Sequence, residues 1–542
     1  NMLRLEREGK NRIWTRILKN SFAPFFIGKF NYVVGNPPWI NWENLPESYR
    51  ECTKPLWDWY GLTKTTKGMG LGKVKRDMAM LFVARCLDRF TKEDGKLAFL
   101  IPFTVYKTRA GAGFRQFLSK GYWKDEEANS PCKVLKIHDL EELLPFEGAM
   151  NRTSLIVVRK SGETKFPIRC IYWKSERKSI AQELELEEVQ KITKRFDFIL
   201  LPLERNKPET MWIEMTEKAF EGIKKVFGIT SYRAYAGVYT ALNQVYWIKV
   251  VQEESNGLLI TNPSISGQKK TVRQVRQIVE KDLVYPLIRG RDVEKWYTKW
   301  ELGHILLPVD KHGRTLPHDK LKVQYPQAWK YFSNFIEDLV NRGGEPYKSK
   351  FKPYRENRFE VAEKTAPPFY WLFNVKPSLN PYKVVWKEVS ARQQKLGFEV
   401  AVIEPKETKP VIPDHTVVMI PCRNLEEAHY LAAILNSNII SLACLYMITS
   451  GLKNLKISKF NPQNPLHQKL SLLSQKAHKI ARKIYEENRE NLKEELGRIE
   501  AEIDETVAEL YDITKDELKE IKRCLAILKG ERMKKKKSSR GR

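Results

Sequence analysis

Paired cysteines, long apolar runs and clustered histidines are all missing from this 542-residue sequence. Its seven cysteines are scattered singly without a Cys-x-x-Cys pair, which argues against zinc ribbons and thioredoxin-like redox sites. An odd, dispersed set is typical of a reducing cytoplasm, where cysteines serve mainly as small core residues. The eight histidines show no metal-ligand spacing, so no metal site is expected. No signal peptide and no apolar stretch of about 18 residues is present, which argues against membrane insertion.

Acidic residues are too few to balance the basic ones. The sequence holds 95 Lys and Arg against 66 Asp and Glu, a formal net charge of +29. The last fourteen residues carry eight Lys or Arg and one Glu, so +22 remains in the body of the protein. A basic body predicts a polyanionic partner, and 11% aromatic residues fit a packed protein rather than a disordered basic one. We therefore expect roughly two or three folded domains and a nucleic-acid partner.

The most informative motif is Asn36-Pro37-Pro38-Trp39, at the end of the apolar run 30–35. A short run rich in β-branched and aromatic residues predicts a buried strand, and two prolines end its hydrogen-bonding ladder. In open α/β sheets, ligands bind at the carboxyl ends of the strands. The side-chain oxygen of Asn36 and the carbonyl of Pro37 can accept hydrogen bonds from an exocyclic amino group, and Trp39 offers a stacking face for a flat base. A strand followed by an ordinary Asn-Pro turn is the alternative.

Residues Phe30 to Trp39 resemble the fourth motif of the amino-group DNA methyltransferases that use S-adenosylmethionine, in the order where target recognition follows catalysis. Similar enzymes methylate N6 of adenine, and many belong to restriction–modification systems that join the methylase and the specificity domain in one chain. The resemblance implies that Asn36, Pro37 and Trp39 hold and stack a flipped base. The family usually has Asp at the position of Asn31, where this sequence departs from the pattern.

Helices and strands are expected to alternate after this motif, as in an α/β sheet. The apolar pattern predicts a helix over residues 79–90, a polar turn at 92–95, a strand at 96–102, a helix from about 113, and strands at 134–137 and 154–158. In the resembling family, the helix that opens at Asp77 lies near the cofactor. Phe146 is the candidate for stacking on the opposite face of the extruded base. A core phenylalanine before a strand is the alternative for Phe146.

A charged, weakly patterned stretch follows, and we expect a connecting region with one helix over residues 166–210. Residues 211–465 resemble the specificity domain that follows the methylase, in four blocks that keep the family order. The blocks are residues 237–248, 285–293, 383–387 and 429–437. Basic residues in this part can neutralise phosphates, read guanine edges or simply be solvated, and sequence alone does not separate these roles. The candidates for DNA binding are Lys269, Lys270, Arg273, Arg276, Arg289 and Arg291.

The helical pattern strengthens after Pro465. Residues 466–528 are predicted to be helical, with an apolar stripe that packs within the specificity domain or, alternatively, forms a dimer seam. Residues 529–542 are expected to form a disordered basic tail that adds nonspecific DNA affinity. The resemblance implies that residues 1–165 are the C-terminal part of a methyltransferase catalytic domain. In the resembling family the main cofactor loop lies upstream of this point, so we expect it in an N-terminal methylase or nuclease segment or in a partner chain.

The expected fold class is α/β, with a partial Rossmann-like methyltransferase sheet, a mixed α+β target-recognition domain and a helical C-terminal region. The predicted function is site-specific transfer of a methyl group from S-adenosylmethionine to N6 of adenine in double-stranded DNA. Methylation of N4 of cytosine is the nearest alternative, and a noncatalytic DNA-recognition subunit is another. No ordered Asp…Glu-x-Lys set supports a nuclease within this sequence.

Overall fold

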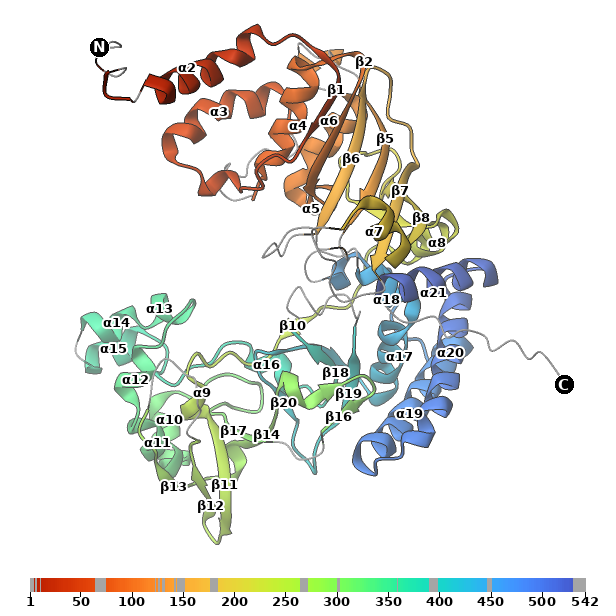
Figure 1. Ribbon diagram of the computed structural model, residues 1–542. Helices are drawn as coiled ribbons and strands as arrows, with labels where there is room; N and C mark the ends of the chain where they lie inside the picture. The colour runs from red at the N-terminus through yellow and green to blue at the C-terminus, as the bar shows by residue number, and fades with distance from the viewer. Residues whose placement is uncertain are drawn as a thin grey trace, which may run out of the picture. The chain divides into compact units, whose positions relative to one another are not determined.

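The computed structural model describes residues 4, 7–9, 11–63, 75–121, 123–124, 127–128, 132–140, 143, 152–175, 184–263, 272–299, 303–357, 359–388, 398–445 and 451–529. The chain folds into two compact units, Asn1–Phe220 and Glu221–Arg542 (Figure 1). Within the described residues, no helix is both long and apolar enough to cross a membrane. The same residues contain no group of three His, Cys, Asp or Glu side chains placed to hold a metal ion.

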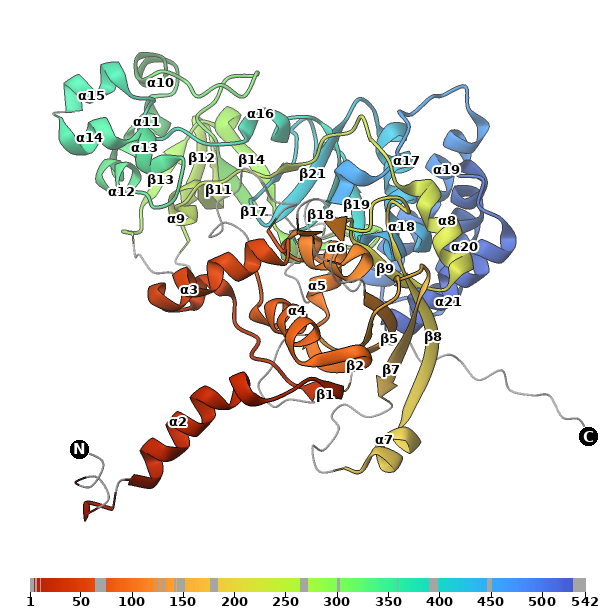
Figure 2. The same cartoon turned by 90° about the horizontal axis from the view of Figure 1, so that it is seen from above.

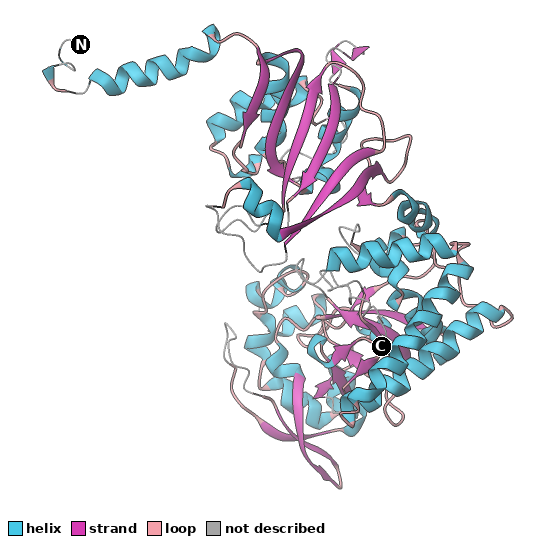
Figure 3. Cartoon of the chain, turned by 45° about the vertical axis from the view of Figure 1, so that its right-hand side comes forward, coloured by secondary structure: helices cyan, strands magenta, loops and turns pink. Residues whose placement is uncertain are grey.

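The first unit is built around a mixed sheet (Figure 3). Its seven strands have the order β1-β2-β6-β5-β7-β8-β9. β1 pairs with β2 and β5 pairs with β7 in parallel, and the other neighbours are antiparallel. The carboxyl ends of β1, β2 and β5 therefore meet the start of β6 at one edge of the sheet. The strands are β1 (Phe30–Gly35), β2 (Thr91–Pro102), β5 (Cys132–Asp139), β6 (Thr153–Lys160), β7 (Ile168–Ser175), β8 (Thr193–Pro202) and β9 (Trp212–Met215).

Helices α4 (Met78–Arg89) and α6 (Ala112–Lys120) pack against β2 and β5, respectively. α4 buries most of its apolar side chains, as its sequence pattern predicts for a core helix. The helix predicted over 79–90 and the strands predicted at 96–102, 134–137 and 154–158 are confirmed, with boundaries that differ by a few residues. The other described helices of four or more residues are α2 (Asn11–Phe26), α3 (Glu47–Trp59), α5 (Thr104–Lys107), α7 (Leu186–Ile192) and α8 (Glu217–Ile223). The boundary between the two units falls within α8, after Phe220.

The turn predicted at residues 92–95 is wrong, because these residues form the beginning of β2. The pairing of β1 with β2 shifts register between Phe30 and Tyr32, and Asp94 adopts a left-handed conformation with φ of 59°. A register shift of this kind lets a strand accommodate polar residues without ending. The strand therefore runs for twelve residues to Pro102.

The region predicted to connect two domains with one helix contains α7, but it also contains β7 and β8. These strands extend the sheet beyond β5. In β7 the buried side chains of Ile168, Cys170 and Tyr172 alternate with Arg169, which is exposed, and Ile171, which is half-buried. This alternation of buried and exposed side chains is typical of a strand. In the sequence it is hard to recognise, because β8 and the segment before α7 are rich in charged residues.

The second unit contains two larger sheets and a short hairpin. The six-stranded sheet has the order β13-β12-β11-β17-β14-β20, and the four-stranded sheet has the order β10-β21-β18-β19. Their strands are β10 (Tyr235–Ala236), β11 (Trp247–Glu254), β12 (Gly257–Thr261), β13 (Arg276–Val279), β14 (Val284–Ile288), β17 (Gly303–Leu306), β18 (Tyr382–Lys387), β19 (Val400–Ile403), β20 (Ile412–Pro413) and β21 (Val417–Cys422). The hairpin consists of β15 (Val293–Glu294) and β16 (Tyr297–Thr298).

Short helices cluster beside the six-stranded sheet and share a hydrophobic core with it (Figure 2). They are α9 (Asn243–Tyr246), α10 (His318–Gln324), α11 (Pro326–Ser333), α12 (Ile336–Val340), α14 (Lys352–Glu356) and α15 (Phe359–Thr365). α13 (Tyr347–Lys350) directly precedes α14 in the chain. α16 (Val375–Ser378) precedes β18. The last helices are α17 (Leu425–Asn436), α18 (Asn438–Cys444), α19 (Pro465–Glu486), α20 (Lys493–Leu510) and α21 (Lys515–Lys529).

The C-terminal helices pack against one another and onto the four-stranded sheet. α17 contacts β18 and β19 on one side and α19 on another, and α19 contacts α20. In the stripe predicted for α20, Ile503 and Val507 are buried, whereas Leu496, Ile499 and Leu510 are half-buried. Packing inside the unit therefore accounts for part of the stripe. The α/β class with mixed sheets and C-terminal helices is thereby confirmed.

Candidate functional site

The Asn36–Trp39 corner lies where β1 ends, at the edge of the sheet that also receives the carboxyl ends of β2 and β5. Asn36 is exposed, and its side chain has no hydrogen-bond partner among the described residues. Pro37 is buried and Trp39 is half-buried, with its Nε1 donating to the carbonyl of Leu100 on β2 at 3.2 Å. The indole is therefore attached to the neighbouring strand, while the amide of Asn36 is available to a ligand.

Asp77 lies beside the segment that leaves this corner. An antiparallel bridge between Asn41 and Asp77 joins the two segments. The Oδ1 of Asp77 caps α4 by accepting a hydrogen bond from the backbone nitrogen of Ala79 at 2.9 Å. Burial raises the pKa of Asp77 to about 6, although this hydrogen bond acts in the opposite direction. Asp77, which the family resemblance implies lies near the cofactor, is thus paired through the backbone with the segment that directly follows the corner.

We expect Asp77→Asn to flatten the pH dependence of stability. Because the folded-state pKa of Asp77 is raised from 3.8 to about 6, its stabilising contribution is fully present below pH 3.8 and is lost as pH rises through 6. Asn is an equally good N-cap and carries no charge. The free energy of unfolding of the variant should exceed that of the wild type by on the order of 2 kcal/mol at pH 8 and should match it at pH 4. Urea unfolding at both pH values measures this, and an equal difference at both would contradict it.

A buried ion-pair network occupies the same edge of the sheet. Arg152, directly before β6, contacts Asp139 at the end of β5 and Glu214 in β9, and both carboxylates are fully buried. The Nε of Arg152 lies 3.0 Å from Oδ2 of Asp139, and its guanidinium carbon lies 4.0 Å from the ring centroid of Phe103. Burial and the charge of Asp139 raise the pKa of Glu214 to about 8, against the effect of Arg152. The network anchors Phe103, the residue that follows β2.

The basic candidates of the second unit differ in how far their charges are already paired. Arg289 directs its Nε to Oδ2 of Asp292 at 3.1 Å and is only 23% exposed, so it contributes mainly to internal packing. Arg291 is 70% exposed and lies 3.8 Å from Asp292. Arg273 and Arg276 are exposed, the latter on β13. Arg273, Arg276 and Arg291 are therefore the members of the predicted set best placed to meet a polyanion.

Three predicted site residues, Phe146, Lys269 and Lys270, lie outside the described residues. In the first unit, Asn36 and Trp39 lie at the end of β1, and Asp77 pairs with Asn41 in the segment that follows them. The second base-stacking residue and the lysine pair remain predictions.

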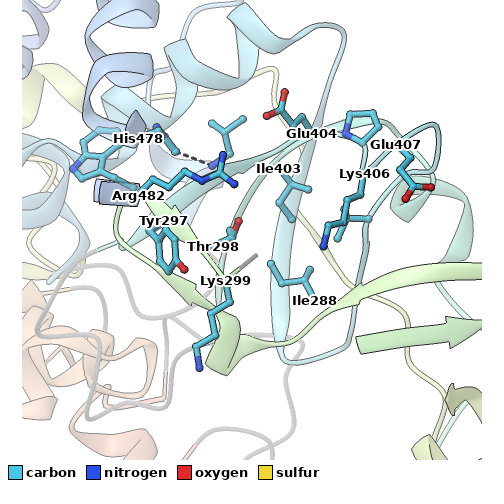
Figure 4. Close-up of a pocket in the computed structure, with 14 residues that line it drawn as sticks. Ile288, Tyr297, Thr298, Lys299, Ile403, Glu404, Lys406, Glu407, His478 and Arg482 are labelled. Atoms are coloured by element: carbon cyan, nitrogen blue, oxygen red, sulfur yellow. Dashed lines mark hydrogen bonds between the residues drawn. The ribbon is translucent and has the colours of Figure 1, made fainter. Parts of the chain in front are cut away.

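A hollow of about 550 Å³ opens in the second unit between the β15–β16 hairpin, β19 and α19 (Figure 4). Tyr297, Lys406 and Arg482 are among the residues that line it. Trp296 and Glu407 also line it, and both are left-handed, with φ of 64° and 56°, a conformation that is rare for residues other than glycine. The predicted site residues that the structure describes do not line this hollow. Its walls come from distant segments, so no local pattern in the sequence could have revealed it.

Comparison with protein families supports the assignment of the first unit. Residues 4–125 match the family model described as Eco57I restriction-modification methylase. This segment contains the Asn36–Trp39 corner, Asp77, β1 and β2. The resemblance of this part of the chain to restriction–modification methylases is therefore confirmed.

One curated relative and several solved structures are similar over longer stretches. The Type II methyltransferase M.BstVI of Geobacillus stearothermophilus is 20% identical over 332 residues, which cover 58% of this chain and 49% of the relative. The chain thus spans about half the length of this relative. The structure of the Type IIL restriction-modification enzyme MmeI in complex with DNA is similar over 92% of this chain and 57% of the MmeI chain, with 9% sequence identity and a TM-score of 0.46. The structure of the type IIG restriction endonuclease BpuSI is similar over 94% of this chain and 54% of the BpuSI chain, with 14% sequence identity and a TM-score of 0.31. Scores this low do not establish a common fold.

Proposed function

We propose that this chain belongs to a restriction–modification DNA methyltransferase and contains its base-binding corner and its target-recognition domain. The enzyme transfers a methyl group from S-adenosylmethionine to N6 of adenine in double-stranded DNA, in the cytoplasm. The observation that carries the proposal is the exposed amide of Asn36 at the carboxyl end of β1, which has no hydrogen-bond partner in the described part of the chain and lies within the segment that matches the methylase family. In this proposal the first sheet is the C-terminal part of a Rossmann-like methyltransferase sheet, with the base corner where such sheets bind ligands.

The chemistry requires the target base to leave the DNA stack, at a cost of a few kcal/mol. The side-chain oxygen of Asn36 and the carbonyl of Pro37 accept the two hydrogens of the amino group and direct its lone pair away from the base plane. Trp39 stacks on the base, which offsets roughly 1–3 kcal/mol of the flipping cost. The cofactor supplies the methyl group, so no side-chain nucleophile is needed. The residues of this chain contribute mainly by positioning.

The same corner suits the amino group of cytosine, and methylation of N4 of cytosine is therefore the nearest alternative. Asn36 and Pro37 contact only the exocyclic amino group in this mechanism, and adenine and cytosine both carry one. Identification of the methylated base in the product DNA separates the two.

The open edge of β1 suits pairing with a further polypeptide segment. Among the described residues, β1 pairs only with β2, and its other edge is open. Phe30, Tyr32 and Val34 on this strand are 48%, 71% and 78% exposed. An open edge with exposed apolar side chains promotes pairing with another strand. We propose that an N-terminal segment or a partner chain covers β1 and brings the main cofactor loop. Without it, the chain acts as the DNA-recognition half of the enzyme, which is the second candidate function.

Calorimetric titration of this chain with S-adenosylmethionine, with and without duplex DNA, tests the proposal. Cofactor binding followed by DNA methylation would support catalysis by this chain. Good DNA binding without cofactor binding would support the recognition half and an external cofactor loop. Absence of both kinds of binding would contradict both candidate functions.

A further inference from the structure

A second hollow of the second unit, about 840 Å³ in volume, is lined in part by basic side chains. Among the described residues its walls include two lysines, one arginine and one histidine, and the carboxylate of Asp310 lies beside it, paired with Nε of Arg314 at 3.2 Å. The two lysines therefore carry the positive charge that is not already paired. The basic residues are Lys311, His312, Arg314 and Lys376, and all four are exposed. The guanidinium of Arg233 lies 5.0 Å from the ring of Tyr235, another lining residue, and adds a further charge at this rim. We refer to this feature as the cationic hollow.

The loop that carries three of these basic residues has a fixed conformation. The Oδ1 of Asp310 accepts hydrogen bonds from the backbone nitrogens of His312 at 2.8 Å and Arg314 at 2.9 Å. Gly313 has φ of +75°, and a Cβ on it would lie 2.7 Å from Cα of Lys376. The loop therefore packs directly against α16, an approach that only glycine permits. This packing places the basic loop beside Lys376.

The opposite wall is anchored from inside the unit. Lys383 on β18 is fully buried, and its Nζ donates to the carbonyl of Ser378 at 3.1 Å and to the carbonyl of Asn380. These two carbonyls belong to the end of α16 and the turn before β18. The buried lysine thus holds the backbone beneath the cationic hollow, while the exposed lysines above it remain directed to solvent.

We propose that the cationic hollow binds the phosphodiester backbone of duplex DNA. The proposal rests on the proposed function, in which duplex DNA is the substrate. Exposed Lys and Arg side chains on an open surface suit phosphates that repeat along a strand. A site for a small free anion would need convergent donors in a more enclosed cavity. The contact is additional to that of Arg273, Arg276 and Arg291 and carries no base specificity.

A pair of charge-neutralising substitutions tests this assignment. Lys311→Gln and Lys376→Gln are combined, because both lysines line the cationic hollow and neither has a side-chain partner among the described residues that its loss would disrupt. The matched control combines Lys476→Gln and Lys479→Gln on α19, which are exposed and outside the cationic hollow. Both variants lose two positive charges. Fluorescence anisotropy with a labelled duplex is measured for each protein over a series of salt concentrations.

We expect the slope of log Kobs against log salt to become shallower by about 2 in the test variant and to stay near the wild-type slope in the control. Equal changes in the two variants, or no change in the test variant, would overturn the assignment while leaving DNA binding itself intact. Tight binding of inorganic pyrophosphate that is lost in the test variant would identify a small-anion site and also overturn it. If single-stranded RNA binds as tightly as the duplex and its binding weakens equally in the test variant, the assignment to duplex DNA is overturned in favour of RNA. If the wild-type chain binds no duplex at all, the proposed function fails as well.

Discussion

Asn36→Ala should lower the rate of methyl transfer by at least roughly 100-fold, the usual loss when one group that stabilises a transition state is removed. Asn36 is exposed and bonded to no described side chain, so its truncation leaves the packing of the first unit unchanged. The lost oxygen is one of two acceptors that would hold the amino group of the target base. Without it the lone pair of that nitrogen is no longer oriented for in-line transfer. The DNA affinity should change little, because the phosphate contacts lie on other residues.

The measurement is the initial rate of tritiated methyl transfer to a saturating duplex, with the wild-type chain in the same assembly as the reference. Asn44→Ala is the matched control, since Asn44 is also exposed, lies eight residues further along the chain and is not part of the corner. Its rate should equal that of the wild type. Full activity of Asn36→Ala would exclude the proposed role of Asn36. A parallel loss of DNA affinity would instead show that the substitution perturbs more than catalysis.

The features that could be predicted from the sequence are those that depend on residues close together in the chain. The strand before the Asn36–Trp39 corner and the helix after Asp77 both follow from local apolar patterns and local caps. The prediction that this strand is buried is wrong, because five of its six residues are exposed. The pairing of Arg289 with Asp292 was also open to prediction, because the two residues are three positions apart. Charge alone places Arg289 among the DNA-binding candidates, because a count of charges does not show which side chains pair internally.

The features that the sequence did not reveal depend on residues that are far apart in the chain. Arg152 is separated from Asp139 by 13 residues and from Glu214 by 62, and the network exists only because the sheet brings the three together. The cationic hollow likewise joins Lys311 and Lys376 through the packing of one loop on α16. Strands β7 and β8 were missed for a different reason, since they lie next to charged segments that conceal the period of two.

Arg152→Met should lower the free energy of unfolding by about 3–5 kcal/mol, the usual cost of leaving a buried charge without its partner. Asp139 and Glu214 are both fully buried, and the substitution removes the guanidinium that contacts both carboxylates. Methionine keeps the contact with Phe103 apolar, so the loss reports mainly on charge. Burial and the charge of Asp139 raise the folded-state pKa of Glu214 from 4.5 to about 8. The contribution of Glu214 to stability is therefore fully present below pH 4.5 and is lost as pH rises through 8. Removing Arg152 raises this pKa further, so the deficit should be larger at pH 8.5 than at pH 6.

Urea unfolding of the wild type and the variant at both pH values measures the deficit. Arg169→Met is the matched control, because Arg169 lies in the same sheet and pairs with Asp197 at 2.8 Å while both side chains are more than 60% exposed. An exposed pair of this kind contributes about 1 kcal/mol or less. Adding Glu214→Gln to Arg152→Met should recover part of the lost stability, since one of the two stranded carboxylates is then neutral. A deficit as small as that of Arg169→Met, or no recovery in the double variant, would show that Arg152 is not needed to neutralise the buried carboxylates.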